Sequence, residues 1–293
     1  MRITQSITYN KYINDIMRNQ ESLYKLNQEL STGRKVNAPS DDPVNASRIL
    51  TGKSVLSEFN QYEKNIDYGL TYLNEAEHTL QGAKDIITKI QELAVSESNG
   101  TASAFSRANT AKVVSGLYDQ LISMGNTSFD NRYIFSGFKT GTPAFSPTGA
   151  YQGDANKYAV KINSNTTVTL GVNGGEVFKG TAGGVDVFQS ISDLVTALNA
   201  NNSTGVQASL DTLEASYKQV SEAVSTVGGR ITRLNAVQTD ISNSKIDLKT
   251  TISSIEDADM ASVISELKLG QIALEASITS AGKVFSINIF NYL

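Results

Sequence analysis

A few polar residues stand at spacings that known catalytic sites use. Ser265 precedes Lys268 and Ser280 precedes Lys283 at the S-x-x-K spacing of penicillin-binding enzymes, and their K-T-G triplet occurs at 139–141. A serine nucleophile needs these partners in one pocket, together with an S-D-N element that the chain lacks. Both S-x-x-K pairs belong to a helical pattern near the end of the chain, whereas K-T-G falls in a loop pattern. We therefore interpret them as surface polar residues and predict no catalytic site and no enzyme.

Three acidic residues close together raise a second possibility, a site for a hard cation, because such ions prefer several carboxylate oxygens. These residues are Glu256, Asp257 and Asp259. Asp257 and Asp259 fall where one predicted helix ends and the next begins, so we interpret them as helix-capping residues. His78 is the only histidine and cysteine is absent, which excludes thiolate sites, disulfides and paired histidine ligands. The sequence predicts neither a metal site nor a cofactor site.

Composition excludes further classes of protein. Charged residues make up 18% of the 293 residues, the hydrophobic fraction is 40%, and the formal net charge is -4. The chain is therefore expected to fold, and it lacks the basic surface that nucleic acid or anionic lipid requires. Its start has no apolar core typical of a signal peptide, and no stretch reaches the roughly 20 apolar residues of a membrane span. We expect no membrane partner, and any export would use a route without a cleaved signal peptide.

A long heptad pattern predicts the first of the main helices in this chain. Apolar residues recur at alternating steps of four and three, and Gly69 alone among these positions is not apolar. The positions are Val55, Phe59, Tyr62, Ile66, Gly69, Leu73, Ala76, Leu80, Ala83, Ile87, Ile90 and Ala94. A repeat averaging 3.5 residues is typical of a helix that supercoils against partners. Asp42 can cap this helix and Pro43 fits its first position, so we predict a helix of about 80 Å from there to about Asn99.

The same pattern returns near the other end of the chain, with polar residues at Gln238 and Lys245. Its positions are Val206, Leu210, Leu213, Tyr217, Val220, Val224, Val227, Ile231, Leu234, Gln238, Ile241, Lys245, Leu248, Ile252 and Ile255. Thr204 and Gln207 indicate a capping box at its start. Two helices of equal length predict a chain that runs out along one and returns antiparallel along the other. A shorter helix is expected beside them, with one face formed by Val113, Leu117, Leu121 and Met124.

Between the long helices the pattern changes to turns and alternation. Eleven of the 22 glycines lie between residues 125 and 184. Apolar residues alternate with polar ones over 158–162 and again over 168–172, and Asn173-Gly174 is a pair suited to hairpin turns. We predict a β-rich insert from 138 to 202 whose contacts lie within itself. It is expected to include a short helix near 190–200.

Two more helical stretches are predicted outside the long helices. The first carries Tyr12, Ile16, Leu23, Leu26 and Leu30, and the second carries Met260, Ile264, Leu267, Leu274, Ile278, Ala281 and Phe285. The predicted architecture is therefore mainly α. It comprises a long antiparallel helical coiled-coil bundle (41–137 with 203–256), the β-rich outer insert (138–202) and a terminal helical region at one end (1–40 with 257–293).

Gly228-Gly229 interrupts the second heptad pattern. Glycine inside a helix costs about 1 kcal/mol relative to alanine, so the pair needs a reason. Close approach of another helix is one interpretation, and a flexible joint is the other.

Three segments of this sequence resemble the corresponding parts of bacterial flagellins and their relatives. They are LSTGRKVNAPSDDP at 30–43, VGGRITRL at 227–234 and IEDADM at 255–260. Within this superfamily the chain resembles the hook-filament junction family, the third hook-associated proteins, more than flagellin itself. The features behind this preference are the opening MRIT, Pro43 after the Asp pair, YQGD at 151–154 and the ending KVFSINIFNYL.

The resemblance implies a structural subunit of the flagellum, located outside the cell after type III export. It implies four partners: the first hook-associated protein, flagellin, like subunits in a ring, and a cytoplasmic export chaperone. We expect the assembly and chaperone interface on apolar residues of the terminal stretches. These residues are Ile16, Leu23, Leu26, Leu30, Leu267, Leu274, Ile278, Phe285, Ile289, Phe290 and Leu293. The alternatives are flagellin itself and, from another class, a surface hydrolase on a helical stalk.

Overall fold

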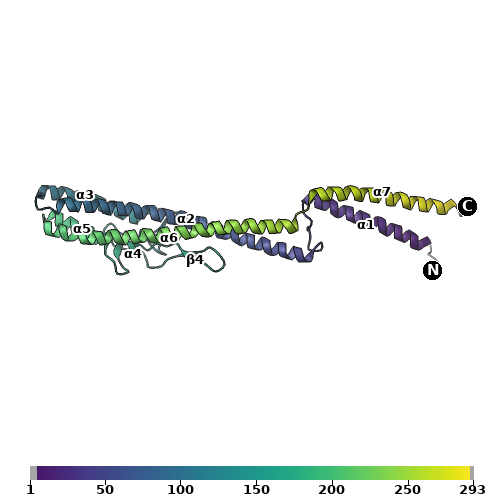
Figure 1. The fold of residues 1–293 in the computed structure, drawn as a ribbon. Helices are drawn as coiled ribbons and strands as arrows, with labels where there is room; N and C mark the ends of the chain where they lie inside the picture. Colours follow the sequence, from purple (N-terminus) through teal and green to yellow (C-terminus); the bar gives the residue numbers. More distant parts are fainter. Residues whose placement is uncertain (1–4, 291–293) are drawn as a thin grey trace. The chain divides into compact units, whose positions relative to one another are not determined.

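The computed structural model describes the backbone of residues 5–290 and the side chains of residue 7 and residues 9–283. Its helices are α1 (Gln5–Thr32), α2 (Pro43–Glu97), α3 (Ala104–Gly125), α4 (Gly174–Lys179), α5 (Val187–Asn199), α6 (Ser203–Glu256) and α7 (Met260–Phe290) (Figure 1). Its strands are β1 (Ser128–Phe129), β2 (Arg132–Tyr133), β3 (Ala159–Lys161) and β4 (Thr167–Thr169). The mainly α fold is thus confirmed, and the described strands are only two or three residues long.

The chain forms two compact units. Unit 1 comprises Met1–Glu58 and Asn243–Leu293, and unit 2 comprises Phe59–Ser242. The long helices α2 and α6 contribute residues to both units, so each unit is described by itself. The three-part division into terminal region, bundle and insert stays a prediction about which parts fold independently.

The start of α2 follows the sequence signal. Asp42 Oδ1 accepts hydrogen bonds from the backbone N–H groups of Val44 at 3.1 Å and Asn45 at 3.0 Å, and Pro43 is the first helical residue. The capping box predicted for α6 is wrong. Asn202 caps that helix instead, with its Oδ1 accepting from the N–H of Gly205 at 3.0 Å. Both residue types are good caps, and the observed cap lies two residues before Thr204, so α6 begins at Ser203, close to the predicted start.

In unit 2, α2 and α6 run antiparallel as predicted. Gln238 Nε2 donates to Asp67 Oδ1 at 2.7 Å, which explains how a polar residue is accommodated in the heptad pattern. The remaining heptad residues of this unit are buried or half-buried, and they belong to one continuous hydrophobic core. The heptads therefore identified the seam between the two long helices correctly.

A second line of buried residues on α2 was not evident from the heptads. It includes Tyr72, Thr79 and Ile86, which are seven residues apart. The Tyr72 hydroxyl donates to the carbonyl of Ile134 at 2.9 Å, and its ring lies 6.0 Å from that of Phe129. Helix α2 is thus covered on two sides, because the chain around the β1–β2 hairpin packs on it as well.

Gly69, the one gap in the first heptad pattern, is buried where the insert packs against the long helices. A Cβ atom built there would lie 3.1 Å from Leu170 Cδ2 and 3.2 Å from Leu234 Cδ1. The two leucine side chains fill the volume that an apolar residue would occupy. Glycine therefore replaces an apolar residue in the heptad pattern at the point where the insert packs on α2.

Helix α3 begins at the N-cap Ser103 and packs against α5. Its buried face includes Ala111, Val114 and Leu121, whereas Val113, which we placed on that face, is exposed. The other three residues of the predicted face do pack inward, since Leu121 is fully buried and Leu117 and Met124 are half-buried against the hydrophobic core.

The insert contains little β-structure. β3 and β4 form a hairpin in which Val160 pairs with Val168, and the chain turns between residues 161 and 167. Asn173-Gly174 is not the predicted hairpin turn. The Asn173 side chain caps α4, accepting from the N–H of Gly175 at 2.7 Å. Helix α5 confirms the predicted short helix near 190–200.

The insert is not self-contained, contrary to our expectation about its contacts. Phe145 of the insert would contact a Cβ at Gly125 at 2.7 Å, and Phe188 packs edge-on against Tyr118 of α3. Asn65 of α2 donates to the carbonyl of Lys161 at 2.8 Å. The buried residues of the insert and of the helices in unit 2 form one hydrophobic core, so the insert and this part of the bundle stabilise each other.

Candidate assembly interface

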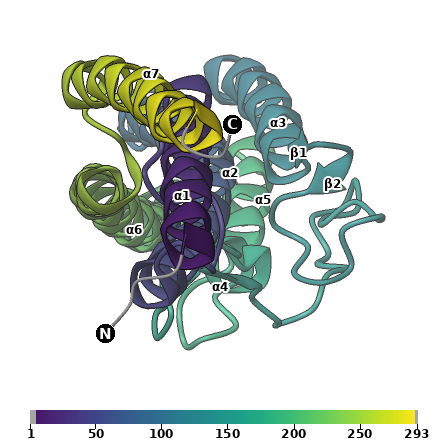
Figure 2. The same ribbon diagram turned by 90° about the vertical axis from the view of Figure 1, so that its right-hand side faces the viewer.

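The two terminal helices of unit 1 lie side by side and antiparallel (Figure 2). Asn19 Nδ2 of α1 donates to Ser277 Oγ of α7 at 3.1 Å. Nearer the start of α7, a Cβ at Gly270 would lie 2.9 Å from Leu23 Cδ2. A residue without a side chain therefore lets the two helices approach closely at this point.

The predicted interface residues fall into three groups. Six of them are half-buried within the subunit: Ile16, Leu23, Leu26, Leu30, Leu267 and Leu274. Ile278 is exposed. The side chains of Phe285, Ile289 and Phe290, together with the whole of Leu293, lie outside the described residues. The predicted interface residues whose side chains are described thus lie largely in the contact between α1 and α7. Their role in assembly stays a prediction.

A different set of apolar residues faces outward on the same two helices. Tyr24 of α1 is 71% exposed, and Leu269 and Ile272 of α7 are each 64% exposed. Ile7, Met17 and Ile264 are exposed as well. The sequence signal for this surface was the spread of apolar residues around more than one helix face. We call these six residues the outer apolar surface.

The connections between the terminal helices and the long helices are held together by a polar cluster. Glu256 Oε1 accepts from Lys53 Nζ at 2.7 Å and from Arg34 Nε at 3.0 Å, and the Glu256 side chain is only 7% exposed. The N–H of Lys35 donates to the Glu256 carbonyl at 2.8 Å, and the N–H of Ala258 donates to the Gly33 carbonyl at 2.9 Å. Both connections are thus fixed to each other by main-chain and charged bonds.

The acidic residues near 256 are used as structural groups. Asp259 Oδ1 accepts from the N–H of Ala261 at 3.0 Å, which confirms its capping role at α7. Asp257 accepts a hydrogen bond from the Ser253 hydroxyl, and Glu256 is occupied by its two cationic partners. The described residues contain no group of three or more potential metal ligands.

The residues with catalytic spacing belong to different compact units. Ser265, Lys268 and Ser280 are exposed on α7 in unit 1, whereas residues 139–141 form part of a loop in unit 2. In that loop the Thr140 carbonyl accepts from the N–H of Tyr133 at 2.9 Å. His78 is exposed on α2, which confirms its interpretation as a surface residue.

One carboxyl group between α1 and α7 has a perturbed pKa. Burial raises the pKa of Glu29 above its ordinary value of 4.5, and the nearby carboxylates of Glu266 and Asp41 raise it further. Ionised Glu29 is therefore disfavoured in the packed pair of terminal helices.

Among the described residues, every helix is too short or too polar to cross a lipid bilayer.

Comparison with known proteins relates the whole arrangement to one superfamily. Residues 3–140 match the bacterial flagellin N-terminal helical region, and residues 210–293 match the C-terminal helical region. Flagellar hook-associated protein 3 of Salmonella typhimurium is 28% identical, with 99% of each chain covered. The flagellin of Listeria monocytogenes is 25% identical over 95% of this chain and 94% of its own.

A solved structure has the same fold. The crystal structure of Xanthomonas campestris FlgL superposes with a TM-score of 0.62 at 18% identity, covering 69% of this chain and 100% of that one. Both family regions, the full-length relatives and the fold agree with the resemblance seen in the sequence. The chain belongs to the flagellin superfamily and is similar to its hook-associated protein 3 branch.

Proposed function

We propose that this protein is a structural junction subunit of the bacterial flagellum, which links the hook-associated ring to the flagellin filament through its terminal helices. The observation that carries the proposal is the outer apolar surface of α1 and α7. Full-length similarity to hook-associated protein 3 supports the same role. The protein acts by assembly and performs no catalysis.

The exposure of this surface is the physical argument for assembly. Burial of a large apolar side chain stabilises a protein by roughly 1.5–3 kcal/mol, so leaving Tyr24, Leu269 and Ile272 in water gives up a considerable stabilisation. Apolar surface that a single chain leaves uncovered is typical of interaction sites. Neighbouring subunits that cover this surface would recover the stabilisation, and this supplies the driving force for joining a growing flagellum.

The proposed partners follow from the position of a junction. The first hook-associated protein binds on the hook side, flagellin binds on the filament side, and like subunits complete the ring. Before export, a cytoplasmic chaperone covers the apolar residues of the C-terminal helix and prevents aggregation. The subunit then leaves the cell through the flagellar export apparatus.

The proposal is tested by adding purified protein to isolated hooks and imaging the tips by electron microscopy. Wild-type protein is expected to form a short, defined addition at the tip. A variant with Leu269→Asp and Ile272→Asp is expected to fold, because both side chains are exposed, and to lose tip binding. Gln271→Asp, at an exposed polar position of the same helix, is the matched control and should still bind. A double variant that binds as well as wild type would refute the role of this surface.

Flagellin itself is the second candidate, because the Listeria flagellin aligns over nearly the full chain. Deletion of the gene separates the two functions. Loss of a junction subunit should leave hooks without filaments and flagellin in the medium. Loss of the filament protein should leave hooks with no secreted flagellin, and that result would favour the second candidate.

A further inference from the structure

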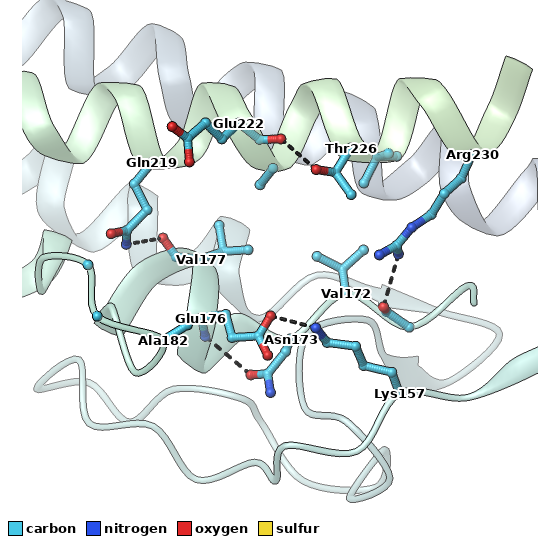
Figure 3. Close-up of a pocket in the computed structure, with 15 residues that line it drawn as sticks. Lys157, Val172, Asn173, Glu176, Val177, Ala182, Gln219, Glu222, Thr226 and Arg230 are labelled. Atoms are coloured by element: carbon cyan, nitrogen blue, oxygen red, sulfur yellow. Dashed lines mark hydrogen bonds and ion pairs between the residues drawn. The ribbon is translucent and has the colours of Figure 1, made fainter. Parts of the chain in front are cut away.

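A pocket of about 410 Å³ lies in unit 2 between α6 and the chain around α4 (Figure 3). Val172 and Val177 come from the insert, and Ala223 and Val227 come from α6, so both contribute apolar residues to a lining that is otherwise largely polar. Gln219 closes one side, donating to the carbonyls of Val177 at 2.8 Å and Val185 at 3.0 Å. The pocket is therefore built on ordered elements of one compact unit.

Arg230 points into this pocket from α6 (Figure 3). Its Nη1 donates to the Gly171 carbonyl at 3.2 Å, and no carboxylate among the described residues lies within ion-pair distance of it. Burial lowers the pKa of Arg230, and nearby Glu176 opposes this shift. Glu176 forms its own ion pair with Lys157 at 2.5 Å. A half-buried guanidinium thus retains most of its donors and lacks a directly paired anion.

The rim of the pocket is open and polar. Gly183, Gly184, Glu222 and Thr226 line it and are exposed. Sites for small molecules usually enclose most of their ligand within apolar walls. The open rim here fits a side chain that projects from another protein surface better than a free small molecule.

The paired glycines singled out in the sequence lie directly beside Arg230. A Cβ atom at Gly229 would meet nothing within 4 Å, and one at Gly228 would meet only the Glu77 carboxylate at 3.6 Å. No described helix of this subunit therefore approaches the pair closely. At these two positions α6 carries no side chain, so another chain can come close to the helix backbone there.

We propose that the Arg230 pocket receives an Asp or Glu side chain from a second copy of this chain, which completes an ion pair with the guanidinium. The inference deepens the proposed function, which places like subunits next to one another. Arginine is suited to this role because its planar fork binds a carboxylate through two parallel hydrogen bonds. A second copy can supply such a side chain, because the chain has 29 acidic residues against 25 lysines and arginines.

Photo-crosslinking in the assembled state tests which chain fills the pocket. A photo-reactive residue replaces Thr226 in the full-length protein, which is then added to isolated hooks, irradiated and digested. Mass spectrometry is expected to show a crosslink to an acidic peptide of another copy, absent from the free subunit. Thr239 is the matched control, because it is also exposed on α6 and its hydroxyl also bonds to a carbonyl four residues earlier. Crosslinks confined to one copy would overturn the proposal.

Substitution of the arginine tests the ion pair. Arg230→Gln is expected to weaken association between copies at hook tips by about tenfold, and Arg230→Lys by less. Arg233→Gln, at an exposed position outside the pocket lining, should have no effect. If wild type and Arg230→Gln associate equally, this inference fails while the proposed function stands; if wild type does not join hooks, the proposed function fails. Saturable binding of acetate or citrate to the free subunit without crosslinks between copies would assign the pocket to a free carboxylate and refute the second-copy occupant.

Discussion

The two compact units use similar helical patterns with opposite results for their apolar residues. The continuous hydrophobic core lies entirely in unit 2, where residues such as Leu80 and Ile87 are fully buried. Among its described side chains, unit 1 has only a few buried apolar residues, such as Ile49 and Val263, and it carries most of the exposed large apolar residues that the structure describes. Its terminal helices are held by the contact between α1 and α7 and by the polar cluster around Glu256.

This comparison shows that an apolar face on a helix does not by itself determine whether that face is buried. In unit 2, α2 is covered by α6 and by the chain around β1 and β2, so two faces are buried. In unit 1, α1 and α7 cover only one face of each other. We infer that unit 2 supplies the stability of the subunit and that unit 1 keeps apolar surface available for neighbours.

The largest expected effect comes from truncating leucines in the two units. Leu80→Ala should lower the free energy of unfolding by about 2–5 kcal/mol, because it leaves a cavity in a closed core. Leu269→Ala should change it by less than about 0.5 kcal/mol, since the side chain is exposed in the free subunit. Chemical denaturation followed by circular dichroism measures both. Equal losses in the two variants would contradict the division of roles.

A smaller loss is expected when the polar cluster of unit 1 is broken. Glu256→Gln removes the negative charge that Arg34 and Lys53 share, and it should cost about 1–3 kcal/mol. Because both cations are partly exposed, water compensates some of the loss. Hydrogen exchange should become faster in the first turns of α7 while unit 2 stays protected. Glu275→Gln, at an exposed position of α7, serves as control, and unchanged exchange in Glu256→Gln would show that the cluster does not hold unit 1 together.

The glycine pair of α6 provides a third test. Gly229→Ala should stabilise the free subunit by about 1 kcal/mol, because space is open there and alanine favours helix. Gly69→Ala should gain less or lose stability, since its new methyl group would press on Leu170 and Leu234. Thermal unfolding compares the two variants. A destabilised Gly229→Ala variant would show that the free subunit itself needs the glycine.

The smallest expected effect is a pH dependence of the terminal helices. The pKa of Glu29 is raised in the folded state, so the folded chain binds more protons than the unfolded chain between 4.5 and the raised pKa. Stability therefore falls as the pH rises through this window. The advantage of Glu29→Gln over wild type should grow over the same window, as measured by denaturation at several pH values. Glu21→Gln, which changes an exposed carboxylate four residues from Lys25, should show no such growth.

Several elements could be predicted from local sequence because their causes are local. Heptad spacing located α2 and α6, and Asp42 and Asp259 identified helix starts through their own hydrogen bonds. The cap at Asn202 and the short helix after Asn173 were missed. Asparagine serves turns and caps equally well, so the residue type alone did not distinguish them.

For the candidate interface, the sequence by itself determined that both terminal stretches are helical and that the C-terminal one is apolar on more than one face. Only the tertiary structure decided that Leu23 and Leu274 belong to the half-buried face while Tyr24 and Ile272 face outward. It also decided that the insert packs into the core of unit 2 and that Arg230 enters a pocket where none of the described carboxylates pairs with it. The physical reason is that periodicity fixes which residues share a helix face, whereas burial and charge pairing depend on the surfaces that distant segments bring to that face.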